Sequence, residues 1–341
     1  MNYFPENIKN ILITGGSGFI GSTLVQRLLK ETNCKIYNLD KLSYASYFRE
    51  NNNNFNSKRY ELLKVDLANE EDTKNAVKIS NPDLVFHLAA ESHVDNSICS
   101  PKVFLESNII GTYNLLEALR SYWELLTEKK KNSFKFLHVS TDEVFGSLEN
   151  NELFTEESLY NPRSPYSATK AASDHLVRAW NNTYHIPTLI TNSCNNFGPR
   201  QFPEKLIPVI IKRALAKEDI PIYGDGQNIR EWLFVEDHID ALIKVMQKGK
   251  IGDTYCIGSK NLKTNEEIVE LVCNSLDTYN IQNAPHIRFK SYIKDRAGHD
   301  RRYAIDSKKI TEELQWKPKH DIIDGITITV KWYLNNLDWL N

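Results

Sequence analysis

The chain has 341 residues, of which 41% are hydrophobic and 25% are charged, and its formal net charge is −2. This apolar content is enough to bury a core and argues against disorder, while 14 Gly and 12 Pro exclude a collagen-like sequence. The near-neutral charge gives no reason to expect nucleic acid as a partner.

The first half of the chain alternates short apolar runs with longer amphipathic stretches, which is typical of βαβ units. Strands are predicted at residues 10–14, 35–39, 61–65, 83–88, 134–140 and 188–192, and helices at 19–30, 70–79, 103–126 and 165–184. The fold class is therefore α/β, a doubly wound parallel sheet with helices on both faces. Four consecutive asparagines at 51–54 predict a solvated loop after the second strand.

After about residue 195 the alternation loosens into short strands, helices over 204–216 and 236–247, and a last helical group from 307 onward. We expect a nucleotide-binding domain over 1–194, with returning segments near 236–250. A smaller lobe over 195–341 would then bind the substrate.

The segment NILITGGSGFIGS places Gly15, Gly18 and Gly21 between the first strand and the first helix. Glycines there permit a tight turn, close approach of the backbone to a pyrophosphate, and packing of helix on sheet. Glycine turns without a ligand also occur, but Asp40 ends the second strand nineteen residues after Gly21, where its carboxylate can accept from a ribose hydroxyl. A Rossmann-type site for NAD is predicted, preferred over NADP, although Lys41 next to Asp40 weakens that preference.

Carboxylates also follow the third and fifth strands. Asp66 either reaches the adenine or caps the helix that starts near residue 70. Thr141, Asp142 and Glu143 lie at the carboxyl end of the fifth strand, where open α/β sheets bind ligands. Two adjacent carboxyl groups favour one acid and one base, and the alternative is an acidic loop or a helix cap.

Tyr166 and Lys170 are four residues apart at the start of a helix, so their side chains share one face. A nearby ammonium favours the phenolate and lowers the pKa of a tyrosine, which would let Tyr166 act as a base. Without a nicotinamide-type fold, the same pair would be an ordinary surface pair.

These motifs resemble those of the extended short-chain dehydrogenase/reductase family: TGGSGFIG, Tyr166-x-x-x-Lys170 and the strand-end Thr141. Within the family, HLAAESHVDNSI, STDEVFG, YSATKAASDHLVRAW and NNFGPRQFPEKLIP are most similar to its sugar-nucleotide 4,6-dehydratases, and the similarity runs from about residue 10 to 332. The resemblance implies NAD as cofactor, a dTDP-sugar as substrate, no metal, and a homodimer through the helices at 103–126 and 165–184.

The implied reaction has three steps. Tyr166, helped by Lys170 and Thr141, would take the C4 hydroxyl proton as hydride leaves C4. Glu143 would then remove the C5 proton while Asp142 protonates the departing C6 hydroxyl. Hydride would return to C6, so that the enzyme is a hydro-lyase. An epimerase, a dehydratase of a UDP- or CDP-sugar, and a catalytically silent NAD-binding regulator are the alternatives.

The resemblance also implies binding residues. The cofactor would be met by Gly15, Gly18, Phe19, Ile20, Gly21, Asp40, Lys41, Ser43, Asp66, Leu67, Leu88, Ala89, Ala90, Ser107, Tyr166, Lys170 and Asn196. The substrate would be met by Ser92, His93, Thr141, Asn195, Glu204, Lys205, Leu206, Pro221, Tyr223, Arg230, Asn265, Arg296 and His299. The sequence departs from the family pattern at Ala297, where proline is usual, and at Phe145, where tyrosine is frequent.

Five cysteines without a C-x-x-C pair predict reduced, buried thiols, and no apolar run is long enough to span a membrane. The first ten residues lack the apolar stretch of a signal peptide. We therefore expect a soluble, cytoplasmic protein.

Overall fold

The computed structural model describes residues 3–46, 55, 57–149, 152–295 and 298–340. Its main feature is a seven-stranded parallel sheet with the strand order β10-β6-β5-β4-β1-β2-β3. The strands are β1 (Asn10–Thr14), β2 (Lys35–Asp40), β3 (Tyr60–Lys64), β4 (Leu84–His87), β5 (Lys135–Thr141), β6 (Thr188–Ser193) and β10 (Thr254–Ile257). The chain runs outward from β1 to β3 and then restarts at β4 on the other side of β1. This reversal creates a crevice at the carboxyl ends of β1 and β4.

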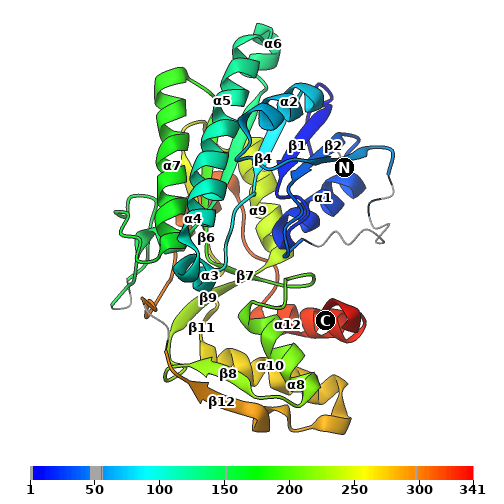
Figure 1. The fold of residues 1–341 in the computed structure, drawn as a ribbon, viewed down its shortest axis with the longest axis vertical. Helices are drawn as coiled ribbons and strands as arrows, with labels where there is room; N and C mark the ends of the chain where they lie inside the picture. Colours follow the sequence, from blue (N-terminus) through cyan, green and yellow to red (C-terminus); the bar gives the residue numbers. More distant parts are fainter. Residues whose placement is uncertain (1–2, 47–54, 56, 150–151, 296–297, 341) are drawn as a thin grey trace.

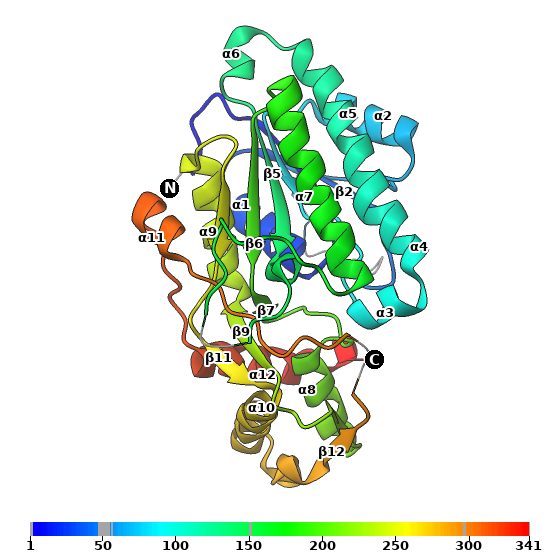
Figure 2. The same cartoon turned by 90° about the vertical axis from the view of Figure 1, so that its left-hand side faces the viewer.

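Helices cover both faces of the sheet, as Figures 1 and 2 show. One layer holds α2 (Glu70–Ser80), α5 (Gly111–Glu124) and α7 (Pro165–Tyr184), and the other holds α1 (Phe19–Glu31) and α9 (Val235–Lys248). Apart from the edge strand β3, which is only partly buried, the strands are almost wholly buried between these layers, in clusters of Ile, Leu, Val and Phe. The α/β fold class is confirmed.

A smaller lobe lies below the carboxyl ends of the strands (Figure 1). It contains the three-stranded sheet β11-β9-β7, the pair β12-β8, and three helices packed around their own apolar cluster. The bounds are β7 (Asn195–Phe197), β8 (Ile220–Tyr223), β9 (Ile229–Phe234), β11 (Leu262–Thr264), β12 (Lys290–Ile293), α8 (Leu206–Ala216), α10 (Asn265–Tyr279) and α12 (Ile322–Leu334). The chain returns to the large sheet through α9 and β10 before it completes this lobe.

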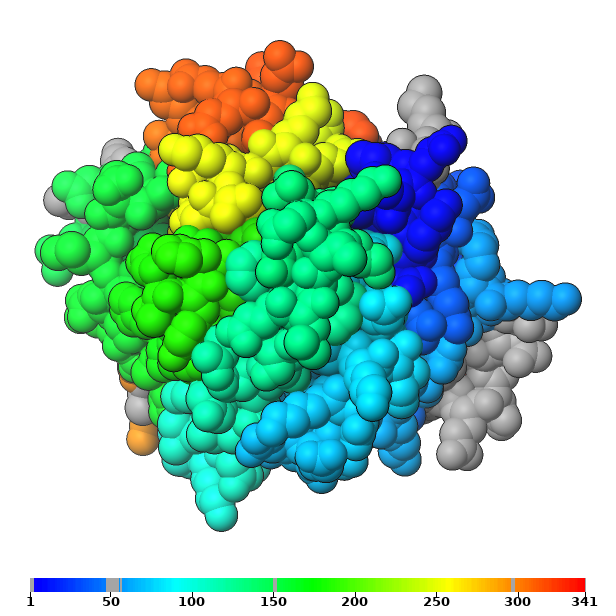
Figure 3. All heavy atoms as spheres, turned by 90° about the horizontal axis from the view of Figure 1, so that it is seen from above, coloured from blue at the N-terminus to red at the C-terminus, as the bar shows by residue number. Residues whose placement is uncertain are grey.

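The predicted element bounds in the first half agree with the structure within about two residues, with one exception. The single helix expected over 103–126 is instead α4 (Pro101–Phe104), a π-helical segment η1 (Leu105–Ile110), and α5. Three short helices remain. They are α3 (Val94–Cys99), α6 (Glu128–Lys131) and α11 (Lys308–Leu314). The helix α6 lies at the end of the molecule that Figure 3 shows. The asparagines at 51–54 lie outside the described residues.

One cysteine prediction is wrong. Cys34, Cys194, Cys256 and Cys273 are buried, but Cys99 is exposed because it lies at the end of the short helix α3. All five thiols are free. Across the described ranges, no helix has the length and hydropathy needed to cross a bilayer.

Candidate active site

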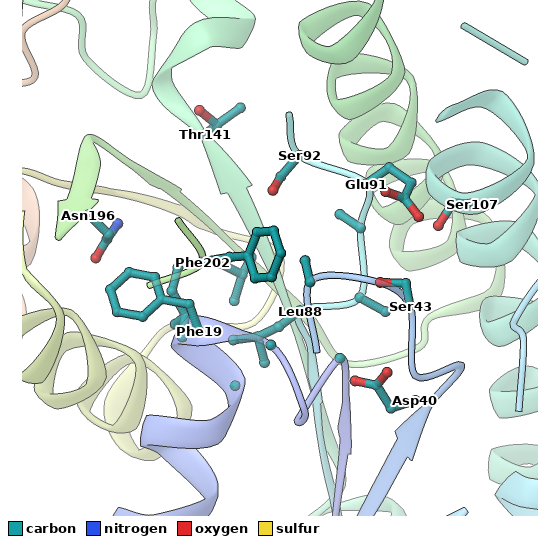
Figure 4. Close-up of a pocket in the computed structure, with 18 of the residues that line it drawn as sticks. Phe19, Asp40, Ser43, Leu88, Glu91, Ser92, Ser107, Thr141, Asn196 and Phe202 are labelled. Carbon is teal, nitrogen blue, oxygen red and sulfur yellow. The ribbon is translucent and has the colours of Figure 1, made fainter. Parts of the chain in front are cut away.

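A cavity of about 320 Å³ lies where the strands of the large sheet end. Its walls come from the turns after β1, β2, β3 and β4, from the end of β5, from α7, and from the segment between β6 and α8. Figure 4 shows Phe19 and Asn196 on one side of it and Asp40 and Ser43 on the other. The cavity therefore occupies the crevice at which doubly wound sheets bind their ligands.

Two glycines of the turn, Gly15 and Gly21, leave no room for a side chain. Gly15 has φ = 71°, which favours glycine, and a Cβ on it would lie 2.7 Å from the Ala89 backbone. A Cβ on Gly21 would lie 2.1 Å from the Gly15 carbonyl oxygen, because α1 packs directly against the turn. Gly18 has only that same oxygen near its Cβ position, at 3.4 Å. The N-terminus of α1 consequently faces the cavity, where its free N–H groups suit phosphate oxygens.

Asp40 is held at the end of β2 by two backbone amides. Its Oδ2 accepts from the Ser17 amide at 2.9 Å and its Oδ1 from the Leu42 amide at 2.8 Å. Burial raises the pKa of Asp40, and these two hydrogen bonds oppose the shift. The carboxylate is thus fixed in the cavity wall.

Asp66 also lines the cavity, and the capping alternative for it is wrong. The N-cap of α2 is Asn69, whose side chain accepts from the Asp72 amide, whereas Asp66 accepts from the Ala68 amide at 3.0 Å. Asp66 therefore stabilises the turn between β3 and α2 and presents its remaining oxygen surface to the cavity.

Tyr166 and Lys170 are not a surface pair, since they are only 9% and 4% exposed. Ser164 caps α7 in a reciprocal capping box and Pro165 occupies its first turn, so the helix starts at a fixed point beside β5. The Lys170 ammonium donates to the Val139 carbonyl at 2.9 Å, and burial lowers its pKa to about 8.

The expected lowering of the Tyr166 pKa is not found. Burial raises the pKa of Tyr166, and the charge of Glu143 adds to the shift, while a hydrogen bond with the Thr141 side chain opposes it. The ammonium of Lys170 is engaged instead with the end of β5. This setting favours the protonated phenol.

A buried polar network lies behind Lys170. Its Nζ is 3.4 Å from His138 Nε2, which is 3.2 Å from Asp174 Oδ1. Asp174 Oδ2 accepts from Ser140 Oγ at 2.9 Å and from Tyr160 Oη at 2.7 Å. Asp174 is completely buried, and these donors hold its pKa below the ordinary value although burial raises it. The network fixes one negative charge beside the ammonium.

Asp142 and Glu143 begin a 3₁₀ turn, η2 (Asp142–Phe145), directly after β5. The cap of this turn is Thr141, whose Oγ1 accepts from the Glu143 amide, so neither carboxylate has the capping role considered as an alternative. Glu143 and Thr141 line the cavity. Asp142 is 1% exposed behind them, and burial, followed by the charges of Glu143 and Glu231, raises its pKa well above the ordinary value.

Every residue that the sequence assigned to the cofactor lines this one cavity. Of the residues assigned to the substrate, Ser92, Thr141, Asn195, Glu204 and Lys205 do so too. His93, Leu206, Pro221, Tyr223, Arg230, Asn265 and His299 lie outside it, on the small lobe and the segments that border it. Arg296 and Ala297 are outside the described residues. The binding roles of these side chains stay predictions.

Arg230 and Lys205 contact protein groups rather than forming a shared cationic patch. Arg230 donates to the Asp300 carbonyl at 2.8 Å and packs on the Tyr303 ring, whereas Lys205 donates to the Ser92 carbonyl at 2.7 Å. Phe145 is 3% exposed and packs against aromatic rings, which explains why a hydroxyl is dispensable there.

Several residues of the cavity wall were not predicted from the sequence, among them Glu91, Cys194, Gln201 and Phe202. Glu91 directly follows the turn after β4, so the strand-end rule that selected Asp142 would also have selected it. The other three lie in an irregular segment whose path depends on the small lobe. No cluster of three His, Cys, Asp or Glu side chains suited to a metal ion occurs in the part of the chain that the structure describes.

Three features occur together here. The strand order of the parallel sheet reverses beside the glycine turn, a carboxylate at the end of β2 is placed to bind a ribose, and a Tyr/Lys pair is buried at the cavity. Together they define a dinucleotide-binding enzyme of the extended short-chain dehydrogenase/reductase class. The family described as GDP-mannose 4,6 dehydratase matches residues 12–329, and the chain belongs to this family.

Relatives with established names are similar over nearly the whole chain. A dTDP-glucose 4,6-dehydratase of Salmonella typhimurium is 49% identical over 340 residues, which cover 97% of this chain and 94% of the relative. The structure of a dTDP-glucose 4,6-dehydratase of Bacillus anthracis in complex with NAD is 38% identical, with a TM-score of 0.85, and covers 98% of this chain and 100% of that one. A UDP-glucose 4-epimerase of Thermotoga maritima, solved with UDP-glucose, is 27% identical, with a TM-score of 0.84 and coverages of 96% and 99%.

Proposed function

We propose that this protein is an NAD-dependent dTDP-glucose 4,6-dehydratase, which converts dTDP-glucose into dTDP-4-keto-6-deoxy-D-glucose and water. The observation that carries the proposal is the Asp142/Glu143 pair beside Tyr166. Oxidation needs only one base, whereas elimination of water also needs a group that takes a carbon-bound proton and a group that protonates a poor leaving group. The names of the relatives support the same reaction.

The residues present fit a dinucleotide. Asp40 is positioned to accept from the ribose hydroxyls, the α1 N-terminus suits the pyrophosphate, and Asp66 and Ala89 border the adenine end of the cavity. When bound, NAD would accept hydride from C4 and return it to C6.

The first step removes two hydrogens from C4 of the sugar. Tyr166 accepts the proton of the C4 hydroxyl, and the C4 hydrogen leaves as hydride. Thr141, whose side chain hydrogen-bonds Tyr166, orients the phenol. The Lys170 ammonium, which contacts the Val139 carbonyl here, would favour the anionic form of Tyr166 only after turning toward it. The resulting C4 ketone makes the neighbouring C5 proton acidic.

The second step uses the two carboxyl groups. Glu143, which lines the cavity, takes the C5 proton, and the C6 hydroxyl leaves as water with a proton from Asp142. Asp142 lies behind the cavity wall, so this proton would have to pass through the Thr141 hydroxyl, 3.3 Å from Asp142 Oδ1. Asp142 suits the role because burial raises its pKa and so favours its protonated form. In the last step hydride reaches C6 and Glu143 returns its proton to C5. Tyr166 then holds the proton of the former C4 hydroxyl and Asp142 lacks the proton given to water, so the enzyme is restored when Tyr166 releases one proton and Asp142 takes one up.

The small lobe would bind the nucleotide end of the substrate. We infer the division made from the sequence, with a cofactor domain over 1–194 plus segments near 236–250 and a substrate lobe over 195–341. Lys205, Arg230 and Arg296 are the cations that suit a diphosphate. A substrate-driven movement would have to release Lys205 and Arg230 from the carbonyl oxygens that they contact here.

An epimerase is the second candidate, because the Thermotoga maritima enzyme shares the fold. Epimerisation at C4 does not require proton removal from C5. A chain that places a protonated Asp142 and a cavity-lining Glu143 next to the Tyr/Lys pair has one acid and one base more than that reaction uses.

We also propose a homodimer through the outer face of α5 and α7. The two helices lie side by side on the surface (Figures 1 and 3), and this region exposes large apolar side chains: Val103, Leu105, Ile110, Tyr113 and Tyr184. Exposed apolar patches of this kind mark contacts between proteins. Sedimentation equilibrium at micromolar protein should give twice the chain mass, and a monomer would contradict the dimer.

A cytoplasmic location is proposed on the state of the cysteines. All five thiols are free, which suits a reducing compartment. Immunodetection in separated cell fractions should place the protein with cytoplasmic markers.

The reaction is tested with the purified protein and dTDP-glucose. Mass spectrometry should detect a product that has lost one water and carries a carbonyl group, and UDP-glucose should be turned over more slowly. Epimerised sugar of unchanged mass would favour the second candidate instead.

A further inference from the structure

An ion pair crosses the cofactor cavity. Lys41 follows β2 and Glu91 follows β4, and Lys41 Nζ lies 2.7 Å from Glu91 Oε1. Since β2 and β4 are the two neighbours of β1, the pair spans the end of β1, next to the glycine turn. Both side chains line the cavity, and that of Glu91 is only 13% exposed. Figure 4 draws Glu91 on the cavity wall.

Glu91 is held in this position by a buried side chain behind it. Asn108, in the π-helical segment η1, accepts from the Glu91 amide at 2.8 Å and donates to the Glu91 carbonyl at 3.0 Å. The side-chain amide of Asn108 also donates to Thr169 Oγ1 at 2.9 Å, so Asn108 is connected to α7. The backbone of Glu91 is therefore fixed on both sides, and its carboxylate is kept within reach of Lys41.

Asp40 is fixed as well, by the amides of Ser17 and Leu42. The ribose end of the cavity thus combines two anchored carboxylates with one lysine. A cation beside the strand-end position is what lets a dinucleotide site accept a 2′-phosphate. Lys41 lies where it could bind a 2′-phosphate, but its ammonium forms an ion pair with Glu91 instead.

We propose that Glu91 is a specificity-determining residue that excludes 2′-phosphorylated dinucleotides by holding Lys41 away from the 2′-phosphate. Asp40 repels the phosphate directly, and Glu91 engages Lys41, a neighbouring cation that would offset this repulsion. The inference deepens the proposed function and rests on NAD as its cofactor.

Binding measurements test this role without relying on turnover. Cofactor-free protein is titrated with NAD and with NADP by isothermal calorimetry, and the quantity compared is the Kd for NADP divided by the Kd for NAD. Glu91→Gln should lower this ratio about tenfold, as expected when one charge-assisted contact to phosphate becomes available. Glu91→Ala serves as a second variant and should change the ratio in the same direction.

Glu61→Gln is the matched control, because Glu61 forms a Lys–Glu pair of the same 2.7 Å length with Lys35 on the surface of β2 and β3. It should leave the ratio unchanged. In the double variant Lys41→Gln/Glu91→Gln the gain for NADP should disappear, because the lysine that provides it is gone.

An unchanged ratio in both Glu91 variants would overturn the proposal, and so would a gain that persists in the double variant. If the ion pair had only a structural role, both dinucleotides would bind more weakly at a constant ratio of Kd values. That result would also contradict the proposal. A wild-type protein that does not bind NAD would contradict the proposed function itself, and that outcome is distinct from the others.

Discussion

Asp142 and Glu143 are consecutive in the chain, yet their carboxyl groups lie in different environments. Asp142 is buried, and its Oδ2 has no hydrogen-bond partner within the described ranges, whereas Glu143 lines the cavity. The Thr141 cap of the 3₁₀ turn produces this difference, because the turn directs one side chain inward and the next toward the ligand. Two carboxyl groups of equal chemistry thereby become suited to acid and base roles.

Glu143→Gln should separate oxidation from elimination. The variant keeps Tyr166 and Lys170, so the C4 hydrogen can still leave, but no base remains for the C5 proton. Stopped-flow absorbance should show NADH forming, and product should fall by about 100-fold or more. Tyr166→Phe is the companion variant and should form no NADH. Undiminished overall turnover in Glu143→Gln would remove Glu143 from its proposed role.

Two glycine variants should differ sharply. Gly21→Ala places a Cβ 2.1 Å from the Gly15 carbonyl oxygen, so α1 or the turn must shift, and we expect NAD affinity to fall at least about tenfold. Gly18→Ala meets that oxygen only at 3.4 Å, so the turn should stay in place, and a weaker NAD affinity there would reflect only the added methyl group at the cavity wall. Thermal unfolding without NAD compares the two variants, and an equal loss of stability in both would contradict the geometry of the turn.

Asp174 should set the alkaline limit of activity through Lys170. Its negative charge raises the pKa of Lys170, which burial lowers to about 8, and the ammonium form is the one that assists Tyr166. Activity that depends on this ammonium is lost as the pH rises through about 8. Asp174→Asn removes the charge, so the fall in kcat should move to lower pH.

Tyr160→Phe is the matched control for that shift. It deletes one hydrogen bond to Asp174, at 2.7 Å, without altering the charge. Its pH profile should keep the wild-type limit even if kcat declines. A common shift in both variants would show that packing, not charge, is responsible.

His238 should make the fold sensitive to acid. Burial lowers its pKa from 6.5 to about 3, and neither ring nitrogen has a hydrogen-bond partner among the residues that the structure describes. Between these pH values the unfolded chain binds a proton that the folded chain does not, so stability falls as the pH drops below about 6.5. The linkage amounts to about 2 kcal/mol by pH 5.

His238→Phe removes this proton uptake, so its free energy of unfolding should depend less on pH between about 6.5 and 5. Urea unfolding at the two pH values measures the difference. The exposed His185, in the left-handed position that ends α7, provides the control, and His185→Asn should retain the wild-type dependence. Parallel curves for His238→Phe and wild type would refute the assignment.

Local sequence patterns were sufficient for much of the fold. The β1–turn–α1 unit and α7 carry their own start signals, glycines in one case and Ser164-Pro165 in the other, and both were placed correctly. The π-helical segment η1 was not predicted, because one widened turn hardly changes the apolar periodicity. α10 was also missed, although Thr264 and Glu267 form the capping box that marks its start.

The site was less predictable wherever it depends on contacts between distant segments. Motif spacing selected Tyr166 and Lys170, but not the His138–Asp174 network behind them, which joins β5 to α7. The pKa of Tyr166 was predicted in the wrong direction, since adjacency to Lys170 on one helix face does not reveal that the ammonium bonds the Val139 carbonyl. Burial and the partner of each charge become visible only in the folded chain.

An isotope transfer experiment tests the central claim most directly. The protein is incubated in ordinary water with dTDP-glucose that carries deuterium at C4, and the product is examined by NMR. The account predicts deuterium at C6 of a 4-keto-6-deoxy sugar, because the hydride removed at C4 returns to the same molecule after elimination. Deuterium retained at C4, or a product whose C6 still bears its hydroxyl, would contradict it.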